Sequence, residues 1–259
     1  MSIIDTGLLI GPCPFRKVPS SVADVAALHE NASLDRAVAT GFRSLLYYDP
    51  IAGLEQDIEQ YKSLADWLHF YAVINPNFPR AGEQVAHAVQ ERQIVGLRLI
   101  PALHHYDLNT SRIRAIVHSA SEHGLPLNLM ARVFDDRMAP RYVNQLVPAP
   151  AEICDFLRTA SDATVILSMF YFTELTALEV DWSALPHVYL DIGCSKPSVA
   201  SLDELSNWFP PERTLFGTGA PFYYWKGSRL GLEGAELSEQ QRRGILGDNA
   251  AEIFPWGDP

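Results

Sequence analysis

The segment IIDTGLLIGP (residues 3–12) opens the chain with an apolar, β-branched run that leads into a glycine and a proline. This pattern predicts a buried strand that ends in a turn. Such an opening strand is typical of a parallel α/β barrel, whose active site lies at the carboxyl ends of the strands. The segment itself offers one side chain with acid–base chemistry, the carboxyl group of Asp5.

Seven further apolar runs follow and alternate with segments of helical period. The runs are RSLLYY (43–48), HFYAVIN (69–75), VGLRLI (95–100), PLNLMAR (126–132), TVILSMF (164–170), VYLDIG (188–193) and TLFGT (214–218). The helical segments cover residues 26–40, 54–68, 82–93, 110–124, 149–161, 201–209 and 237–246. Eight units give about 32 residues each, the size of a βα repeat. The sequence therefore predicts an α/β fold, a (β/α)8 TIM barrel, as a single domain over residues 1–259.

Two local signals support the helix boundaries. Ser238 is followed three residues later by Gln241, a capping-box pattern that predicts the start of the last main helix. Gly124 comes directly after a helical segment and is typical of a helix C-terminus.

Composition and charge narrow the classes of partner. The formal net charge is −11, and nucleic acids and anionic membranes are bound by basic surfaces, so we expect neither as a partner. No basic leader or run of roughly 20 apolar residues is present, which predicts a cytoplasmic protein. Cys13, Cys154 and Cys194 lie far apart and are expected to be reduced thiols. A small molecule is the expected ligand, and a homodimer is an open possibility.

Several strand ends resemble those of the amidohydrolase superfamily, in particular its amidohydrolase-related branch of TIM-barrel metal-dependent hydrolases. The resemblance rests on the order and spacing of motifs along nearly the whole chain. The opening segment resembles I-D-x-H-x-H-x-G, GLRLIP resembles G-[IV]-[KR]-[LF]-H-P, GLPLNLM resembles G-x-P-V-x-x-H, TVILSM resembles V-V-L-A-H, RTLFGTGAPF resembles R-[IV]-L-F-G-S-D-[YW]-P, and ILGDNAAEIF resembles the closing helix.

The resemblance implies a metal centre, but this chain departs from the pattern at every ligand position. Carried over residue by residue, the five positions are Gly7, Leu9, Met130, Met169 and Gly219. A catalytic zinc site takes about three nitrogen, oxygen or sulfur donors and an open water position. Glycine and leucine supply no donor, so we expect no metal and no other cofactor at this site.

Two arginines remain near the predicted rim. Arg98 occupies the basic position of the family on the fourth strand, and Arg132 ends the fifth. Two guanidinium groups that face one cavity suit a carboxylate or phosphate, so both are candidate substrate-binding residues. The alternative is that each arginine has a structural carboxylate partner, for which the candidates are Asp135, Asp191 and Glu174.

The remaining rim candidates carry proton-transfer or hydrogen-bonding groups. His104 and Asp191 are candidate catalytic residues, as general acid or base, and His105 and Tyr171 are candidate substrate-binding residues. The alternative for the histidines is a backbone hydrogen bond within the loop, and for Asp191 a structural role at a strand end. Around them, an apolar floor is predicted from Leu9, Ile100, Met130, Met169 and Phe170, and PFYYW (221–225) is predicted to form a lid or a subunit contact.

Two functions from different classes fit these observations. The first is a metal-independent hydrolase or lyase that acts on a small anionic substrate such as a lactone, amide or carboxylic acid. The second is a non-catalytic barrel that binds a small ligand or a partner protein. Ligand binding without turnover would separate the second from the first.

Overall fold

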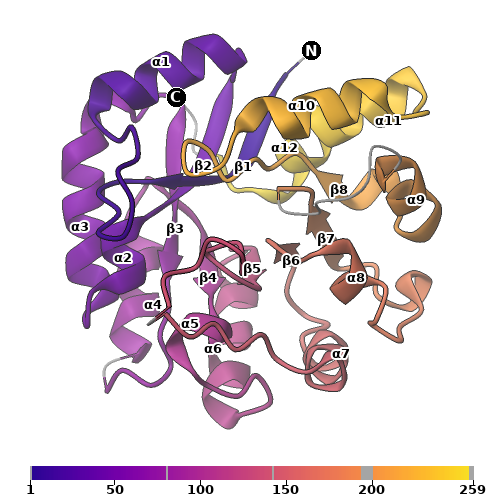
Figure 1. Cartoon of the computed structure of the whole chain (residues 1–259). Coiled ribbons are helices and arrows are strands. Elements are labelled where there is room, and N and C mark those ends of the chain that lie inside the picture. The colour runs from indigo at the N-terminus through magenta and orange to yellow at the C-terminus, as the bar shows by residue number, and fades with distance from the viewer. Residues whose placement is uncertain (1, 80, 142, 194–200, 257–259) are drawn as a thin grey trace.

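In the computed structural model, which describes residues 2–79, 81–141, 143–193 and 201–256, eight parallel strands form one sheet in the order in which they occur along the chain (Figure 1). Backbone hydrogen bonds join the first strand to the segment after the last one, from Thr6 N to Phe216 O at 2.8 Å and from Leu9 N to Ala220 O at 2.9 Å. The sheet is therefore a closed barrel, and the predicted (β/α)8 TIM-barrel fold is confirmed. The strands are β1 (Ile4–Ile10), β2 (Arg36–Gly41), β3 (Leu68–Val73), β4 (Ile94–Leu99), β5 (Leu127–Met130), β6 (Val165–Ser168), β7 (Val188–Asp191) and β8 (Thr214–Leu215).

Helices follow the strands and surround the barrel (Figure 1). The α-helices are α1 (Val22–Ala32), α2 (Phe42–Leu46), α3 (Pro50–Tyr61), α4 (Ala81–Gln90), α5 (Pro101–His104), α6 (Ser111–Glu122), α7 (Pro150–Thr159), α8 (Phe172–Leu175), α9 (Ser201–Trp208), α10 (Trp225–Gly234), α11 (Glu239–Arg243) and α12 (Asn249–Ile253). Short 3-10 turns are η1 (Lys62–Leu64), η2 (Trp182–Ala184) and η3 (Pro211–Arg213), and η4 (Gly244–Asp248) is a π-helical segment.

Both predicted helix boundaries are confirmed. Gln241 N donates to Ser238 Oγ at 3.2 Å and Ser238 N donates to Gln241 Oε1 at 3.0 Å, which completes the capping box of α11. Gly124 follows α6 with φ of +62°, the left-handed conformation that glycine adopts without a Cβ penalty.

The second strand does not lie where the sequence pattern placed it. Residues 43–48 were expected to form it, but residues 42–46 form α2, and the strand is the preceding segment RAVATG. A buried Asp57 explains the helix: its carboxylate accepts from Arg43 Nη1 at 2.7 Å and from Ser44 N at 3.3 Å, which fixes this turn against α3. A Cβ at Gly41 would lie 1.7 Å from Asp57 Oδ2, so β2 ends at a glycine for steric reasons.

The end of the barrel away from the carboxyl ends of the strands, here called the lower end, is filled by an apolar layer. It contains inward-facing residues of the strands together with Ala250 and Phe254 of the C-terminal segment, and the Phe254 ring meets the Tyr71 ring edge-on at 6.0 Å. The other members are Ile4, Val38, Val95, Ile166 and Leu215. Burial of this layer stabilises the closed sheet from below, by about 25 cal/mol for each Å² of apolar surface removed from water.

None of the helices in the described part of the chain is long and apolar enough to cross a bilayer.

Candidate functional site

A layer of polar side chains lies inside the barrel above this lower apolar layer. Its members come from six consecutive strands, and each is at most 2% exposed: Thr40, Tyr71, Arg98, Asn128, Ser168 and Asp191. Polar groups buried to this degree require hydrogen-bond partners, because an unpaired one costs about 1–3 kcal/mol.

Arg98 is the only cationic member of this set. Its guanidinium carbon lies 4.2 Å from the centre of the Tyr71 ring, and its side chain is fully buried. Neither Nε nor Nη2 has a hydrogen-bond partner among the residues that the structure describes. Burial lowers the pKa of Arg98, an effect opposed by the nearby Tyr71 and Asp191. The barrel thus holds a buried guanidinium group with two donor nitrogens that make no hydrogen bond of good geometry to the described residues.

Asn128 and Tyr71 also have unpaired polar atoms beside Arg98. Asn128 pairs with Arg98 in the register of β4 and β5. Its Oδ1 and Nδ2, the Tyr71 hydroxyl and Oγ1 of Thr40 on β2 make no hydrogen bond of good geometry within the described ranges. The Tyr71 hydroxyl nevertheless lies close enough to interact with the Asn128 amide and with the Arg98 guanidinium group. Burial raises the pKa of Tyr71 well above its usual range, so its hydroxyl is neutral at physiological pH.

Asp191, a predicted catalytic residue, lies in the same layer. Its carboxylate accepts from Ser168 Oγ at 2.9 Å and from Gly193 N at 2.6 Å. A Cβ on Gly7 would lie 2.9 Å from Asp191 Oδ2, and one on Gly217 would lie 2.4 Å from Oδ1. Two glycines therefore make room for this carboxylate. Burial raises the pKa of Asp191, and its hydrogen bonds and the charge of Arg98 oppose that shift.

Asp5 is a second buried carboxyl group next to Asp191. It accepts from Thr218 Oγ1 at 2.6 Å and from Gly7 N at 3.0 Å. Burial raises its pKa to about 7, and the neighbouring Asp191 charge adds to the rise. Asp5 is therefore an aspartate that titrates near neutral pH inside the barrel.

An apolar layer covers the polar one at the carboxyl ends of the strands. It includes the predicted Leu9, Ile100, Met130 and Met169, together with Val73. Phe170 was predicted to join them, but it packs in the outer layer between strands and helices. The apolar side chains therefore do not form a floor, because the layer of Arg98 and Asp191 lies beneath them.

Met169 reaches this upper layer through an unusual backbone conformation. Alternation along β6 predicts Leu167 and Met169 on one face. Leu167 instead faces the outer layer, and Ser168 is the residue that faces Asp191. Met169 follows the strand with φ of +60°, which breaks the alternation and places its side chain among the residues of the mouth.

Aromatic side chains from three loops close the mouth above the methionines. The ring of Phe222 lies 5.3 Å from that of Phe42 and 5.5 Å from that of Phe134. Phe222 is 5% exposed. Arg16 stacks on Phe222 with its guanidinium carbon 4.2 Å from the ring centre, and Tyr223 donates from its hydroxyl to Val133 O at 3.1 Å. We call Phe42, Phe134 and Phe222 the aromatic cover.

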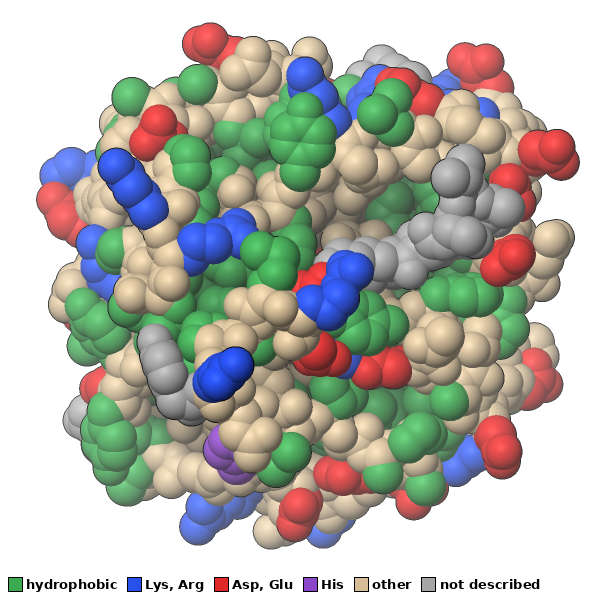
Figure 2. Space-filling model, viewed as in Figure 1, with side chains coloured by type: hydrophobic (Ala, Val, Ile, Leu, Met, Phe, Trp, Pro, Cys, Tyr) green, Lys and Arg blue, Asp and Glu red, His purple; other side chains and the backbone are tan. Residues whose placement is uncertain are grey.

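The segment PFYYW is thus divided between interior and surface. Phe222 belongs to the aromatic cover, while Tyr224 is 70% exposed. Figure 2, viewed as in Figure 1, shows hydrophobic side chains over the middle of this face, with basic and acidic side chains among them.

Arg132 occupies a different environment at the rim. It is buried and donates from Nη1 to Glu174 Oε2 at 2.7 Å and to Met169 O at 3.1 Å, and from Nη2 to Glu174 Oε1. Its guanidinium carbon lies 3.7 Å from the centre of the Tyr171 ring. The Tyr171 hydroxyl accepts from Asp136 N at 3.1 Å. Arg132 and Tyr171 therefore contact each other at the rim, where Glu174 holds the arginine, whereas Arg98 lies in the polar layer inside the barrel.

The two histidines lie on the loop after β4. His104 is partly buried, and its Nε2 is 3.0 Å from Leu45 O. Burial lowers its pKa, which favours the neutral imidazole. His105 is exposed with φ of +52°, and its carbonyl accepts from Asn77 Nδ2 at 3.3 Å. The structure does not bring either histidine into the polar layer.

The positions carried over from the family's metal ligands hold glycine or apolar side chains. Leu9, Met130 and Met169 of the family's ligand positions lie in the upper apolar layer, and Gly219 has φ of +70° with the Tyr223 ring where a side chain would be. No three His, Cys, Asp or Glu side chains of residues 2–79, 81–141, 143–193 and 201–256 are arranged to hold a metal ion. Cys194 lies outside the described residues.

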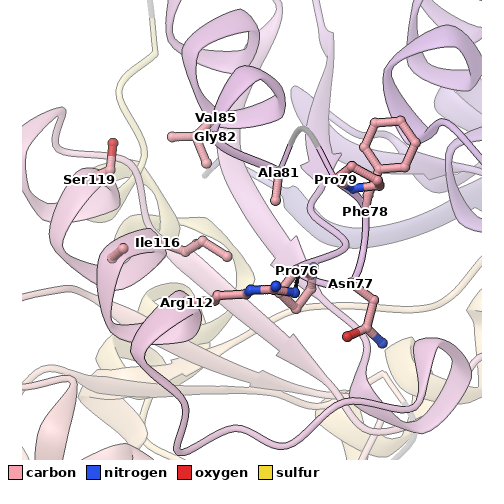
Figure 3. A pocket seen from close by; sticks show the side chains of 11 residues that line it. Pro76, Asn77, Phe78, Pro79, Ala81, Gly82, Val85, Arg112, Ile116 and Ser119 are labelled. Carbon is pink, nitrogen blue, oxygen red and sulfur yellow. Dashed lines mark hydrogen bonds between the residues drawn. The ribbon is translucent and has the colours of Figure 1, made fainter.

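Two surface grooves lie away from the barrel interior. One of about 510 Å³ separates α4 from α6 and is lined by Pro76, Phe78, Val85, Arg112 and Ile116 among others (Figure 3). A neighbouring groove of about 320 Å³ includes His105 and shares Asn77 and Arg112 with it. Arg112 donates to Pro76 O at 3.1 Å across their shared wall. Neither groove contains Arg98 or Asp191.

Comparison with known proteins identifies the family. A model of the amidohydrolase family matches residues 61–256, more than half of the chain. This chain belongs to the amidohydrolase family. No curated protein matches it.

Solved structures show the same fold at low sequence identity. An uncharacterised TIM-barrel protein of Bordetella bronchiseptica is 18% identical, with a TM-score of 0.71 and 98% of each chain covered. A probable 2-pyrone-4,6-dicarboxylic acid hydrolase of Acinetobacter baumannii, with citric acid bound, is 15% identical at a TM-score of 0.66, covering 98% of this chain and 99% of that one. A dihydroxybenzoic acid decarboxylase of Polaromonas, with manganese and an inhibitor bound, is 12% identical at 0.67, covering 97% and 96%.

The sequence predicted Arg98 and Asp191 as site residues, but it did not predict Tyr71, Asn128 or Ser168 as such. Each of the three is a polar side chain within an otherwise apolar strand, and this is the signal that would have marked them. Their common position in one layer depends on the register between neighbouring strands.

Proposed function

We propose that this amidohydrolase-family barrel binds a small organic anion at Arg98 and acts on it without a divalent metal. The observation that carries the proposal is the fully buried Arg98, whose Nε and Nη2 lack partners in the described residues, in the same layer as Asp191. A guanidinium group presents paired donors that fit a carboxylate. The donor-poor side chains at the family's metal positions support a metal-independent reaction.

Asp191 is the group best suited to move a proton in this arrangement. Its two hydrogen-bond donors, Ser168 Oγ and Gly193 N, hold the carboxylate in one orientation, and burial raises its pKa toward the range of a useful general base. The relatives named for hydrolysis or decarboxylation of carboxylic acids agree with a substrate such as a lactone, amide or carboxylic acid. In this proposal Arg98 anchors the anion and Asp191 transfers the proton.

A non-catalytic binding barrel is the second candidate. It is favoured by the rim contacts of two predicted site residues, because Arg132 is engaged by Glu174 and His104 lies against the Leu45 carbonyl. Under this alternative Arg98 still binds an anion, but substitution of Asp191 changes no reaction rate.

Thermal unfolding in the presence of small carboxylates and lactones tests the anion site. We expect ligand-dependent stabilisation of the wild type, which is absent in Arg98→Met and retained in Arg158→Met, a matched change at an exposed arginine. Turnover that Asp191→Asn abolishes while binding persists supports the enzyme. One tightly held metal equivalent per purified chain, or equal stabilisation of Arg98→Met, contradicts the proposal.

A further inference from the structure

We propose that the groove between α4 and α6 binds a straight-chain carboxylic acid of medium length, such as octanoate. The two helices belong to the layer that surrounds the sheet (Figure 1), and none of the residues that line the groove belongs to the polar layer around Arg98. Binding in this groove is therefore independent of the proposed anion site inside the barrel.

The groove has the size and the lining of a small-molecule site. Its volume is about 510 Å³, and ligand sites in proteins typically have about 300–1,000 Å³. Its apolar side chains include Phe78 and Pro79 from the loop after β3, Val85 from α4 and Ile116 from α6 (Figure 3). An apolar ligand body placed between them removes its own surface and that of the wall from water, which favours binding.

Small residues of both helices leave room between these walls. Ala81 and Gly82 begin α4 at the edge of the groove, and Ala115 lies on α6 one turn after Arg112. A Cβ at Gly82 would meet no atom of the described residues within 4 Å. Larger side chains at these positions would therefore occupy the groove itself.

Arg112 places a positive charge at one end of the groove. Its Nη1 donates to Pro76 O at 3.1 Å, which is a neutral acceptor. It forms no ion pair with a carboxylate of the described residues, and this includes Asp107, which lines the neighbouring groove. A guanidinium group presents paired donors to a carboxylate. An arginine without an acidic partner at the end of an apolar groove thus suits the charged head of an organic acid.

The spacing of residues along α6 sets the length of the ligand. Arg112, Ala115, Ile116 and Ser119 lie on one face of the helix, because they are separated by intervals of three and four residues. At about 1.5 Å per residue, the face from the first to the last of them is about 10 Å long. With its carboxylate at Arg112, an extended octanoate chain runs along the two apolar residues and ends near Ser119.

Titration calorimetry with octanoate, butyrate and 1-octanol tests the two parts of this ligand separately. Butyrate keeps the carboxylate and lacks half of the chain, whereas 1-octanol keeps the chain and lacks the charge. We expect wild-type protein to bind octanoate at least about tenfold more tightly than either of the other two, because each lacks one of the two interactions.

Two matched pairs of variants locate the ligand in the groove. Arg112→Met is expected to weaken octanoate binding at least about tenfold, whereas Arg114→Met is expected to change it less than about twofold. Arg114 is an exposed arginine of the same helix that also donates to a backbone carbonyl, that of Asn109. Ala115→Trp fills the groove and is expected to abolish binding. Ala86→Trp, at an exposed alanine of α4 outside the groove lining, is expected to retain it.

Each contrary outcome overturns the site. These outcomes are absence of octanoate binding by the wild type, equal affinity for the three compounds, or unchanged octanoate binding in Arg112→Met or Ala115→Trp. Octanoate binding is expected to persist in Arg98→Met, and its loss there would assign the ligand to the barrel interior. A crystal structure with octanoate decides the location even if a groove variant does not fold, because ligand density away from α4 and α6 contradicts the proposal.

Discussion

Two buried arginines on neighbouring strands of the same barrel differ in how their hydrogen-bonding capacity is used. Arg132, at the rim, donates from both terminal nitrogens to Glu174 and from one of them to Met169 O. Arg98, inside the barrel, stacks on Tyr71 while two of its nitrogens lack partners in the part of the chain that the structure describes. The first arrangement is typical of a structural ion pair, and the second is the arrangement on which the proposed anion site rests. Burial alone does not distinguish the two.

The largest effect is expected from breaking the rim cluster. Glu174→Ala removes the closest carboxylate of the buried Arg132 guanidinium group and leaves Asp136, 3.7 Å from Nε, as the other acidic neighbour, so we expect the free energy of unfolding to fall by up to about 3–5 kcal/mol. Urea denaturation measures this value. Asp155→Ala removes the partner of Arg158 in an exposed pair and is expected to cost less than about 1 kcal/mol. Similar losses in the two variants would show that Glu174 does not hold Arg132.

A second prediction concerns the pH dependence that Asp5 gives to the interior. Its folded-state pKa of about 7 lies above that of an unfolded chain, so the native state binds this proton more tightly. The contribution of Asp5 to stability is therefore present at low pH and is lost as pH rises toward and through 7. We expect a decrease of at most about 1.4 kcal/mol per pH unit from this group.

Urea denaturation of Asp5→Asn between pH 5 and 8 isolates this contribution. Asparagine keeps an acceptor for Gly7 N and does not ionise, so the slope of unfolding free energy against pH is expected to be smaller than in the wild type. An unchanged slope would mean that Asp5 is ionised at the same pH in the folded and unfolded chains. Such a result would show that Asp5 adds no pH dependence to the stability of the barrel interior.

The smallest effect on stability is expected at Arg98 itself. Arg98→Met removes unpaired donors from the interior and keeps most of the side-chain volume, so the unfolding free energy without ligand is expected to change by about 1 kcal/mol or less. Calorimetric denaturation without ligand provides the measurement. A loss as large as that of Glu174→Ala would place Arg98 with Arg132 as a structural arginine.

Some parts of the structure could be predicted from the sequence and others could not. Apolar runs separated by helical segments predicted the barrel, and strand ends predicted Arg98 and Asp191. The second strand was misplaced because RAVATG is rich in small residues and continues a helical pattern, whereas RSLLYY is apolar enough to resemble a strand. What decided between them is Asp57, a contact between α2 and α3 that no local pattern contains.

The candidate site was predictable only in part for a related reason. Strand ends can be read from one run at a time, but the environment of Arg98 depends on which residues of other strands share its layer. Asn128 becomes its neighbour through the register of β4 with β5. Met169 joins the residues of the mouth through a left-handed backbone conformation, which alternation along the strand does not anticipate.

The ring of Phe254 links the candidate site to the C-terminal segment. Phe254 follows all eight strands along the chain and packs in the lower apolar layer. Tyr71 touches this ring on one side and supports the Arg98 guanidinium group on the other. The C-terminal segment therefore helps to set the position of Tyr71, and through it that of the Arg98 guanidinium group, although neither residue is near it in the sequence.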